Sequence, residues 1–214
     1  MMPITHTQAD LDHIEQGTLD HYEGAAESFW QGTRDHDVSQ NIEAFLQALP
    51  KGRELDILDL GCGPGRDLFT FKSAGHRPTG LDGSQTFCQM AEQHSGCPVL
   101  HQQFLSMDLE EDSFDGVFAN ASLFHIPGAE LPRVLIELHR SLRPDGILFT
   151  SNPRGSSEGW QGPRYGHYME LEVTESFLEQ AGFRMLHHYY RPENQPRDQQ
   201  PWLAIVSQRR NLSR

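Results

Sequence analysis

The chain has 214 residues, with 17 Lys and Arg against 30 Asp and Glu and a formal net charge of -13 at pH 7. Hydrophobic residues make up 36 % of the chain, which is enough for a folded core in a chain of one-domain size. Because nucleic-acid binding depends on Lys and Arg that neutralise phosphates, the acidic balance argues against a general nucleic-acid binder. No apolar run approaches the roughly 18 residues that span a bilayer, and the first residues are polar, so we expect a cytoplasmic protein without a membrane anchor.

The cysteines and histidines indicate neither a disulfide framework nor a metal site. Cys62, Cys88 and Cys97 are odd in number and lack CxxC spacing. The 12 histidines form no HxxxH or HExxH pair. We therefore expect no bound metal.

Short apolar runs alternate with amphipathic patterns along the chain. A polar N-terminal segment leads to an expected helix at residues 39–49, where apolar residues recur at three- and four-residue steps. The next expected elements are a strand at 56–60, a helix at 66–74, a strand at 78–81, a helix at 85–94, a weak strand at 99–102, a strand at 116–119, a helix at 131–142 and a strand at 147–151.

The last third of the chain has a different order of elements. A turn at residues 144–146 precedes the strand at 147–151, and a glycine-rich loop with several aromatics follows over residues 152–169. A helix is expected at 174–181, followed by two strand-like runs at 185–190 and 202–207 with no helix between them. These runs should pair as an antiparallel hairpin at the edge of a mostly parallel, seven-stranded, doubly wound α/β sheet.

A glycine-rich loop, residues 61–65 (GCGPG), separates the first strand from the next helix. Glycines there let a ligand approach the main chain at the carboxyl edge of a parallel sheet. Arg66 stands where the dinucleotide fingerprint GxGxxG has its last glycine, which disfavours a pyrophosphate loop. Asp82 ends the second strand about 20 residues after Gly61, where a carboxylate can accept both ribose hydroxyls of an adenosine ligand. The alternative is a tight turn without a ligand, with Asp82 capping the next helix.

At these residues the sequence resembles the class I S-adenosylmethionine-dependent methyltransferases. Asp59 and the glycine loop match the family's first motif, and Asp82 matches the acidic residue of its second strand. Residues 114–125 resemble the fourth motif, and residues 142–148 resemble the turn before the fifth strand. In detail, the chain looks most like small single-domain bacterial enzymes near the tellurite-resistance type.

The resemblance implies one methyltransferase domain over residues 1–214, with the lid at 1–50, a cofactor-binding core at 55–150 and an acceptor side at 152–200. The cofactor would be S-adenosylmethionine, the product S-adenosylhomocysteine, and the methyl group would pass to a small molecule by in-line displacement. Residues 120–123 (NASL) lack the N/D-P-P-Y/F motif of members that methylate adenine or glutamine, which also argues against a nucleic-acid role. Two alternatives stay open: a non-catalytic S-adenosylmethionine-binding regulator and an NAD-dependent oxidoreductase. The oligomeric state is not indicated.

Cofactor contacts follow from the same resemblance. Gln103 stands where many members have an acidic residue near the adenine, so adenine recognition would rest on backbone groups of Phe104 and Leu105. Tyr22 would shield the cofactor as part of the lid, although an aromatic residue on a short helix is also typical of a core position. The cofactor-binding residues expected are Tyr22, Arg34, Asp59, Gly61, Cys62, Gly63, Gly65, Arg66, Asp82, Gly83, Ser84, Phe104, Leu105, Asn120 and Ala121.

Arg34 and Arg66 are the candidates for pairing with the cofactor carboxylate, because a guanidinium binds both oxygens of a carboxylate. The alternative is an ion pair with a neighbouring aspartate, namely Asp35, Asp37 or Asp67.

His125 lies just past the fourth strand and is the candidate general base, because its ordinary pKa suits proton transfer near neutral pH. The alternative is a histidine that caps or packs the loop after that strand. On the acceptor side, cationic and aromatic residues gather in a loop longer than a simple connection, which suits a small, flat or anionic acceptor. A mobile, solvent-facing loop whose arginines balance an acidic surface is the alternative there. The acceptor-side residues expected are Arg154, Arg164, Tyr165 and Tyr168.

Overall fold

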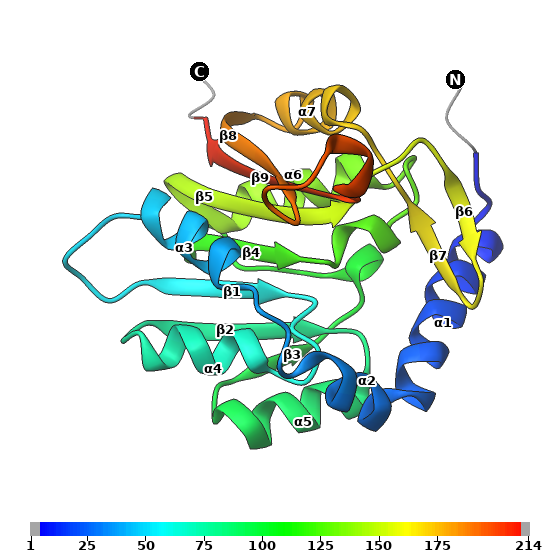
Figure 1. Cartoon of the computed structure of the whole chain (residues 1–214). Coiled ribbons are helices and arrows are strands. Elements are labelled where there is room, and N and C mark those ends of the chain that lie inside the picture. The colour runs from blue at the N-terminus through cyan, green and yellow to red at the C-terminus, as the bar shows by residue number, and fades with distance from the viewer. Residues whose placement is uncertain (1–4, 211–214) are drawn as a thin grey trace.

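A seven-stranded sheet forms the middle layer of the computed structural model, which describes residues 5–210 (Figure 1). The strand order is β3-β2-β1-β4-β5-β9-β8, and β9 runs antiparallel to both of its neighbours while the other pairs are parallel. The expected fold, a mostly parallel doubly wound sheet with an antiparallel C-terminal hairpin, is confirmed. The strands are β1 (Asp56–Leu60), β2 (Arg77–Asp82), β3 (Val99–His101), β4 (Phe114–Asn120), β5 (Leu142–Pro153), β8 (Phe183–Arg191) and β9 (Trp202–Arg209).

Helices cover both faces of this sheet. On one face, the buried rings of Phe45 and Phe71 pack from two helices against Phe118 and Phe149 of β4 and β5. The other face is covered by the helices Leu131–Ser141 and Leu171–Gln180, and their buried leucines include Leu138. None of the helices in residues 5–210 is long and apolar enough to cross a membrane. The helices are α1 (Gln8–Gly24), α2 (Ala26–Thr33), α3 (Ser39–Ala48), α4 (Arg66–Ser73), α5 (Gln85–Ser95), α6 (Leu131–Ser141) and α7 (Leu171–Gln180).

The order of strands changes direction at β1, which pairs with β2 on one side and with β4 on the other. Open α/β sheets bind ligands at such a switch point, beside the carboxyl ends of the strands. The parallel strands point toward α1 in Figure 1, so α1 stands across the edge where a ligand would bind. The polar N-terminal segment thus contributes a long helix, which begins with a capping box formed by Thr7 and Asp10.

The expected loop at 152–169 is wrong in part, because it contains a second, two-stranded sheet. β6 (Glu158–Gln161) and β7 (Arg164–His167) pair antiparallel around a two-residue turn. Gly162 has a φ of 66° at the first position of that turn, and Pro163 follows, a pattern typical of a type II′ hairpin. Figure 1 shows this hairpin beside α1, and the Tyr165 N–H donates to Thr18 Oγ1 at 3.2 Å.

The turn expected at residues 144–146 lies inside β5 instead of before it. Leu142 already pairs with Phe114 of β4, and the register shifts before Gly116 pairs with Ile147. Asp145 lies within this irregular part of the strand and has a left-handed φ of 63°. The turn is therefore a bulge in a longer strand.

Candidate functional site

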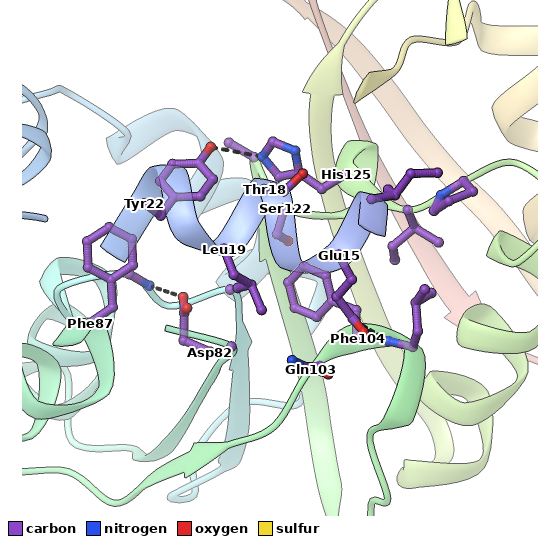
Figure 2. Close-up of a pocket in the computed structure, with 18 of the residues that line it drawn as sticks. Glu15, Thr18, Leu19, Tyr22, Asp82, Phe87, Gln103, Phe104, Ser122 and His125 are labelled. Carbon is purple, nitrogen blue, oxygen red and sulfur yellow. Dashed lines mark hydrogen bonds between the residues drawn. The ribbon is translucent and has the colours of Figure 1, made fainter. Parts of the chain in front are cut away.

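Two adjoining cavities lie at the carboxyl ends of β1, β2 and β4. The first has a volume of about 750 Å³ and is roofed by α1 (Figure 2). The second, of about 1370 Å³, lies toward α2 and the ends of β8 and β9. Both are lined by Phe29, Gly61, Gly63 and Ala121, so together they form one site on either side of the glycine loop.

The glycines of the loop serve different purposes. Gly61, Gly63 and Gly65 all have positive φ values, of 73°, 51° and 89°. A Cβ at Gly61 would lie 2.5 Å from the Cβ of Ser122, and one at Gly65 would lie 2.7 Å from the Cα of Ala91. At Gly63 the nearest atom would be 3.7 Å away, in the ring of Phe29. Gly61 and Gly65 therefore allow close packing, whereas Gly63 leaves space for a ligand.

Asp82 is buried at the end of β2 and faces the first cavity. Its Oδ2 accepts the Gly63 N–H and its Oδ1 accepts the Ser84 N–H, each at 2.9 Å. The cap of α5 is Ser84, whose Oγ accepts the Phe87 N–H, so Asp82 is not the helix cap of the alternative interpretation. Burial raises the pKa of Asp82 to about 6, against the lowering effect of these backbone donors. Each oxygen keeps a further lone pair for a ligand hydroxyl.

The far end of the first cavity is formed by residues that follow β3. Gln103, Phe104 and Leu105 line it, as the resemblance implies for an adenine site. The Leu105 N–H donates to Oε1 of Glu15 at 3.1 Å. Glu15 comes from α1 and was missed by the sequence reasoning, because no local pattern connects a helix residue with a loop 90 positions later.

A second buried carboxylate, Asp59 of β1, lines neither cavity, although it is expected among the cofactor-binding residues. Its Oδ2 has no hydrogen-bond partner within residues 5–210. Burial, together with the negative charge of Asp67, raises the pKa of Asp59. Asp67 and Asn120 line the second cavity, and Asn120 is held by a 2.9 Å hydrogen bond from Asn41.

His125 is not placed as the expected general base. Its Nδ1 lies 2.7 Å from the carbonyl oxygen of Tyr165, so Nδ1 carries the proton and Nε2 accepts the Tyr22 hydroxyl at 2.9 Å (Figure 2). Arg164 in turn donates to the Tyr22 oxygen at 2.9 Å. Burial lowers the pKa of His125 to about 4, which makes it a weak base. The alternative reading, a histidine that packs the loop after β4, is the one that the geometry supports.

Tyr22 lies where a lid residue is expected. It lines the first cavity from α1, and its ring packs against Phe29 and Phe87 at centroid distances of 5.5 and 5.8 Å. Phe29 lies between the two cavities, so this aromatic cluster excludes water from the centre of the site.

Neither arginine is free to bind a carboxylate, which corrects that expectation. Arg34 is exposed, pairs with Asp35 at 3.3 Å and lines neither cavity. Arg66 lines the second cavity, but its guanidinium makes two bonds to Asp67, of 2.8 and 3.0 Å. A third bond goes to the carbonyl oxygen of Thr33. The ion pairs weighed as the alternative are those that form.

The four acceptor-side residues expected, Arg154, Arg164, Tyr165 and Tyr168, line neither cavity. Arg154 donates to the carbonyl oxygens of Arg197 and Gln200, and Tyr165 is buried with its hydroxyl on Glu158. Their segment folds onto α1 and the C-terminal strands, which positions these side chains as structural supports. The side chains that line the second cavity in their place include Trp30, His36, Asp37, Arg191 and Trp202.

Comparison with known families shows what this site is similar to. Residues 58–150 match a family model described as "Methyltransferase domain". The chain is similar to this family over less than half of its length. The match covers the glycine loop, Asp82 and β4, and it leaves the finer resemblance to tellurite-resistance enzymes untested.

Individual proteins with known activities are similar to the same part of the chain. The malonyl-[acyl-carrier protein] O-methyltransferase of Pectobacterium atrosepticum is 32 % identical over 125 residues, covering 56 % of this chain and 49 % of the relative. The trans-aconitate 2-methyltransferase of Delftia acidovorans is 30 % identical over 123 residues, covering 53 % of this chain and 44 % of the relative. The chain thus spans about half the length of these curated relatives.

A solved structure agrees with the fold over nearly the whole chain. The 1,6-didemethyltoxoflavin-N1-methyltransferase of Burkholderia thailandensis, crystallised with S-adenosylhomocysteine, superposes with a TM-score of 0.77 at 20 % identity. The superposition covers 98 % of this chain and 94 % of the other.

S-adenosylmethionine is the cofactor that the resemblance implies, and residues of the first cavity fit it. The open side of Gly63 leaves room for the cofactor next to the main chain. Asp82 offers free lone pairs to two ribose hydroxyls. Adenosine bound in the first cavity would therefore pair carboxylate oxygens that are otherwise incompletely paired.

Proposed function

We propose that this chain transfers the methyl group of S-adenosylmethionine to a small-molecule acceptor. The observation that carries the proposal is the buried Asp82 carboxylate, held by two backbone N–H groups against the open side of the glycine loop at the switch point of the sheet. When bound, the cofactor supplies a methyl group on a positively charged sulfur, ready for in-line displacement. The protein contributes chiefly by aligning the donor and acceptor.

The residues of the site divide this work between them. Asp82 binds the ribose, and Asn120, which lines the second cavity, orients the amino-acid end. Tyr22 and Phe29 exclude water between the cavities, because their rings close against each other. His125 holds the Tyr22 hydroxyl and takes no proton from the acceptor in this proposal.

The second cavity is the proposed place of the acceptor. Trp30 and Trp202 offer flat apolar surfaces, and Arg191 and His36 offer groups that bind an anion. The names of two relatives include malonyl and aconitate groups, both of which carry carboxylates. A small carboxylate or a flat anion is therefore the acceptor class we propose. A role without nucleic acid and a cytoplasmic location stay predictions from the sequence.

A screen of acceptors tests the proposal. The chain is incubated with S-adenosylmethionine and a panel of small carboxylates, phenols, amines and thiols, and S-adenosylhomocysteine is quantified by mass spectrometry. We expect product above the acceptor-free background with at least one anionic acceptor, and loss of that product in Gly63→Arg, whose side chain fills the shared cavity. Tight cofactor binding without turnover on any acceptor supports the alternative, a non-catalytic S-adenosylmethionine-binding regulator.

A further inference from the structure

Glu15 brings a carboxylate from α1 into the far end of the first cavity. Its Oε1 accepts the Leu105 N–H, and Glu15, Gln103 and Phe104 line the same end of the cavity. Figure 2 shows Glu15 beside Phe104, on the opposite side of the view from Asp82. If Asp82 holds the ribose, Glu15 lies where the base of the adenosine would be.

This carboxylate is incompletely paired. The bond from Leu105 is the only hydrogen bond to the Glu15 carboxylate in the part of the chain that the structure describes, which leaves Oε2 without a protein donor. Burial raises the pKa of Glu15, the negative Asp12 on the same helix adds to this effect, and Arg133 opposes it. A donor from a ligand would reduce the cost of burying the charge.

The loop after β3 lacks a carboxylate of its own at this place. Gln103 lines this end of the cavity from that loop, and an amide presents both a donor and an acceptor. A carboxylate presents only acceptors, so it distinguishes an amino group from a carbonyl oxygen.

We infer that Glu15 accepts a hydrogen bond from the exocyclic amino group of the cofactor's adenine, and that α1 thereby supplies the base-reading carboxylate that the loop after β3 lacks. The inference rests on the proposed binding of S-adenosylmethionine. It follows that a residue of the sheet binds the ribose and a residue of α1 binds the adenine. Both parts of the cofactor are therefore bound only when α1 covers the cavity.

Calorimetric titration with two ligands tests this inference. S-adenosylhomocysteine carries the amino group, whereas S-inosylhomocysteine carries a carbonyl oxygen in its place. We expect the wild type to prefer S-adenosylhomocysteine by about 10- to 100-fold, the effect of one charge-assisted hydrogen bond. Glu15→Gln keeps the length of the side chain and an oxygen for Leu105, but it also offers a donor to the carbonyl. The preference should therefore fall at least tenfold in this variant.

Controls separate the outcomes. Asp20→Asn removes an exposed carboxylate from the same helix that does not act on the pKa of Glu15, and it should leave both affinities unchanged. An equal loss of affinity for both ligands in Glu15→Gln would overturn the inference, because a purely structural role for Glu15 predicts that result. A preference that survives in Glu15→Gln but disappears in Gln103→Leu would also overturn it. A wild type that binds neither ligand contradicts the proposed function itself, which is a different result from either of these.

Discussion

Asp82 is the single side chain on which cofactor affinity should depend most. Its two expected bonds to ribose hydroxyls are charge-assisted, and each is on the order of 1.5 to 3 kcal/mol. Asp82→Ala should therefore weaken S-adenosylhomocysteine by at least about a hundredfold in calorimetry, since 1.4 kcal/mol is about a factor of ten and the two bonds together amount to at least about 3 kcal/mol. Asp108→Ala removes an exposed carboxylate and is the matched control. Unchanged affinity in Asp82→Ala would place the ribose elsewhere.

The raised pKa of Asp82 predicts a pH dependence of binding. Ribose hydroxyls donate to the carboxylate and stabilise its charged form, so the pKa of Asp82 should be lower in the complex than its value of about 6 in the free protein. Affinity should be constant above pH 6 and fall as the pH drops through 6 toward 5, because free Asp82 becomes protonated and binding must release that proton. Titrations in buffers of different ionisation enthalpy measure this proton release. An affinity that rises on acidification in this range would contradict the assignment.

Asp145 occupies a backbone conformation that favours glycine. Its φ is 63° and its side chain is exposed in the bulge of β5. Asp145→Gly should raise the free energy of unfolding by roughly 0.5 to 1 kcal/mol, because glycine adopts this φ without the steric cost of a Cβ. Asp112→Gly is the comparison, since Asp112 also has a positive φ but pairs with Arg209. In thermal denaturation, Asp112→Gly should be stabilised less than Asp145→Gly, or be less stable than the wild type.

At the residue scale, the sequence predicts those parts of the site that lie on one continuous motif. The glycine loop and Asp82 lie at the ends of two neighbouring strands, and the structure places them together as expected. The pairing of Arg66 with Asp67 and the burial of His125 depend on side-chain packing, which spacing along the chain does not encode. Glu15 is the clearest example, because only the docking of α1 brings it to the cavity.

At the scale of elements, the β6–β7 hairpin holds α1 over the first cavity. Trp160 lies against the helix at Gly17, where an added Cβ would be 2.7 Å from the indole ring. The Tyr165 N–H donates to Thr18, and Arg164 reaches Tyr22. The hairpin was missed from sequence because glycine and proline dominate its short strands and turn, and its pairing is stabilised by contact with a helix more than 130 residues earlier.

Removing the indole of Trp160 should therefore destabilise α1 without destabilising the central sheet. Trp160→Ala should speed amide hydrogen exchange in α1, residues 8–24, while exchange in β1 and β4 stays unchanged, because the central sheet has its own buried core. The matched control is Phe69→Ala, another half-exposed aromatic residue, located on α4. Equal exchange in α1 for wild type and Trp160→Ala would show that the hairpin does not hold the helix.

At the scale of the whole molecule, the mostly parallel sheet was predictable because most of the buried strands are separated by amphipathic helices, which favours right-handed crossovers between parallel strands. The C-terminal pair lacks an intervening helix and is antiparallel, as expected. The position of α1 across the carboxyl edge was not predictable in this way, because it depends on contacts with three separate segments of the chain.

The overall charge of -13 leads to a further expectation for the whole molecule. A surface with this balance repels polyanions, so tRNA and duplex DNA should not bind at physiological salt. Fluorescence anisotropy across a salt series measures this directly. Tight binding of tRNA or DNA at low salt, with an affinity that falls steeply as salt rises, would reveal a local basic groove. It would contradict the prediction that the acceptor is only a small molecule.

The most direct measurement is a calorimetric titration of the wild-type chain with S-adenosylmethionine, S-adenosylhomocysteine and NAD. A site that holds adenosine on Asp82 beside Gly63 predicts micromolar binding of the first two ligands, no detectable binding of NAD, and loss of binding in Gly63→Arg. Tight binding of NAD with no binding of S-adenosylmethionine would contradict the central claim that this cavity is a methyl-donor site.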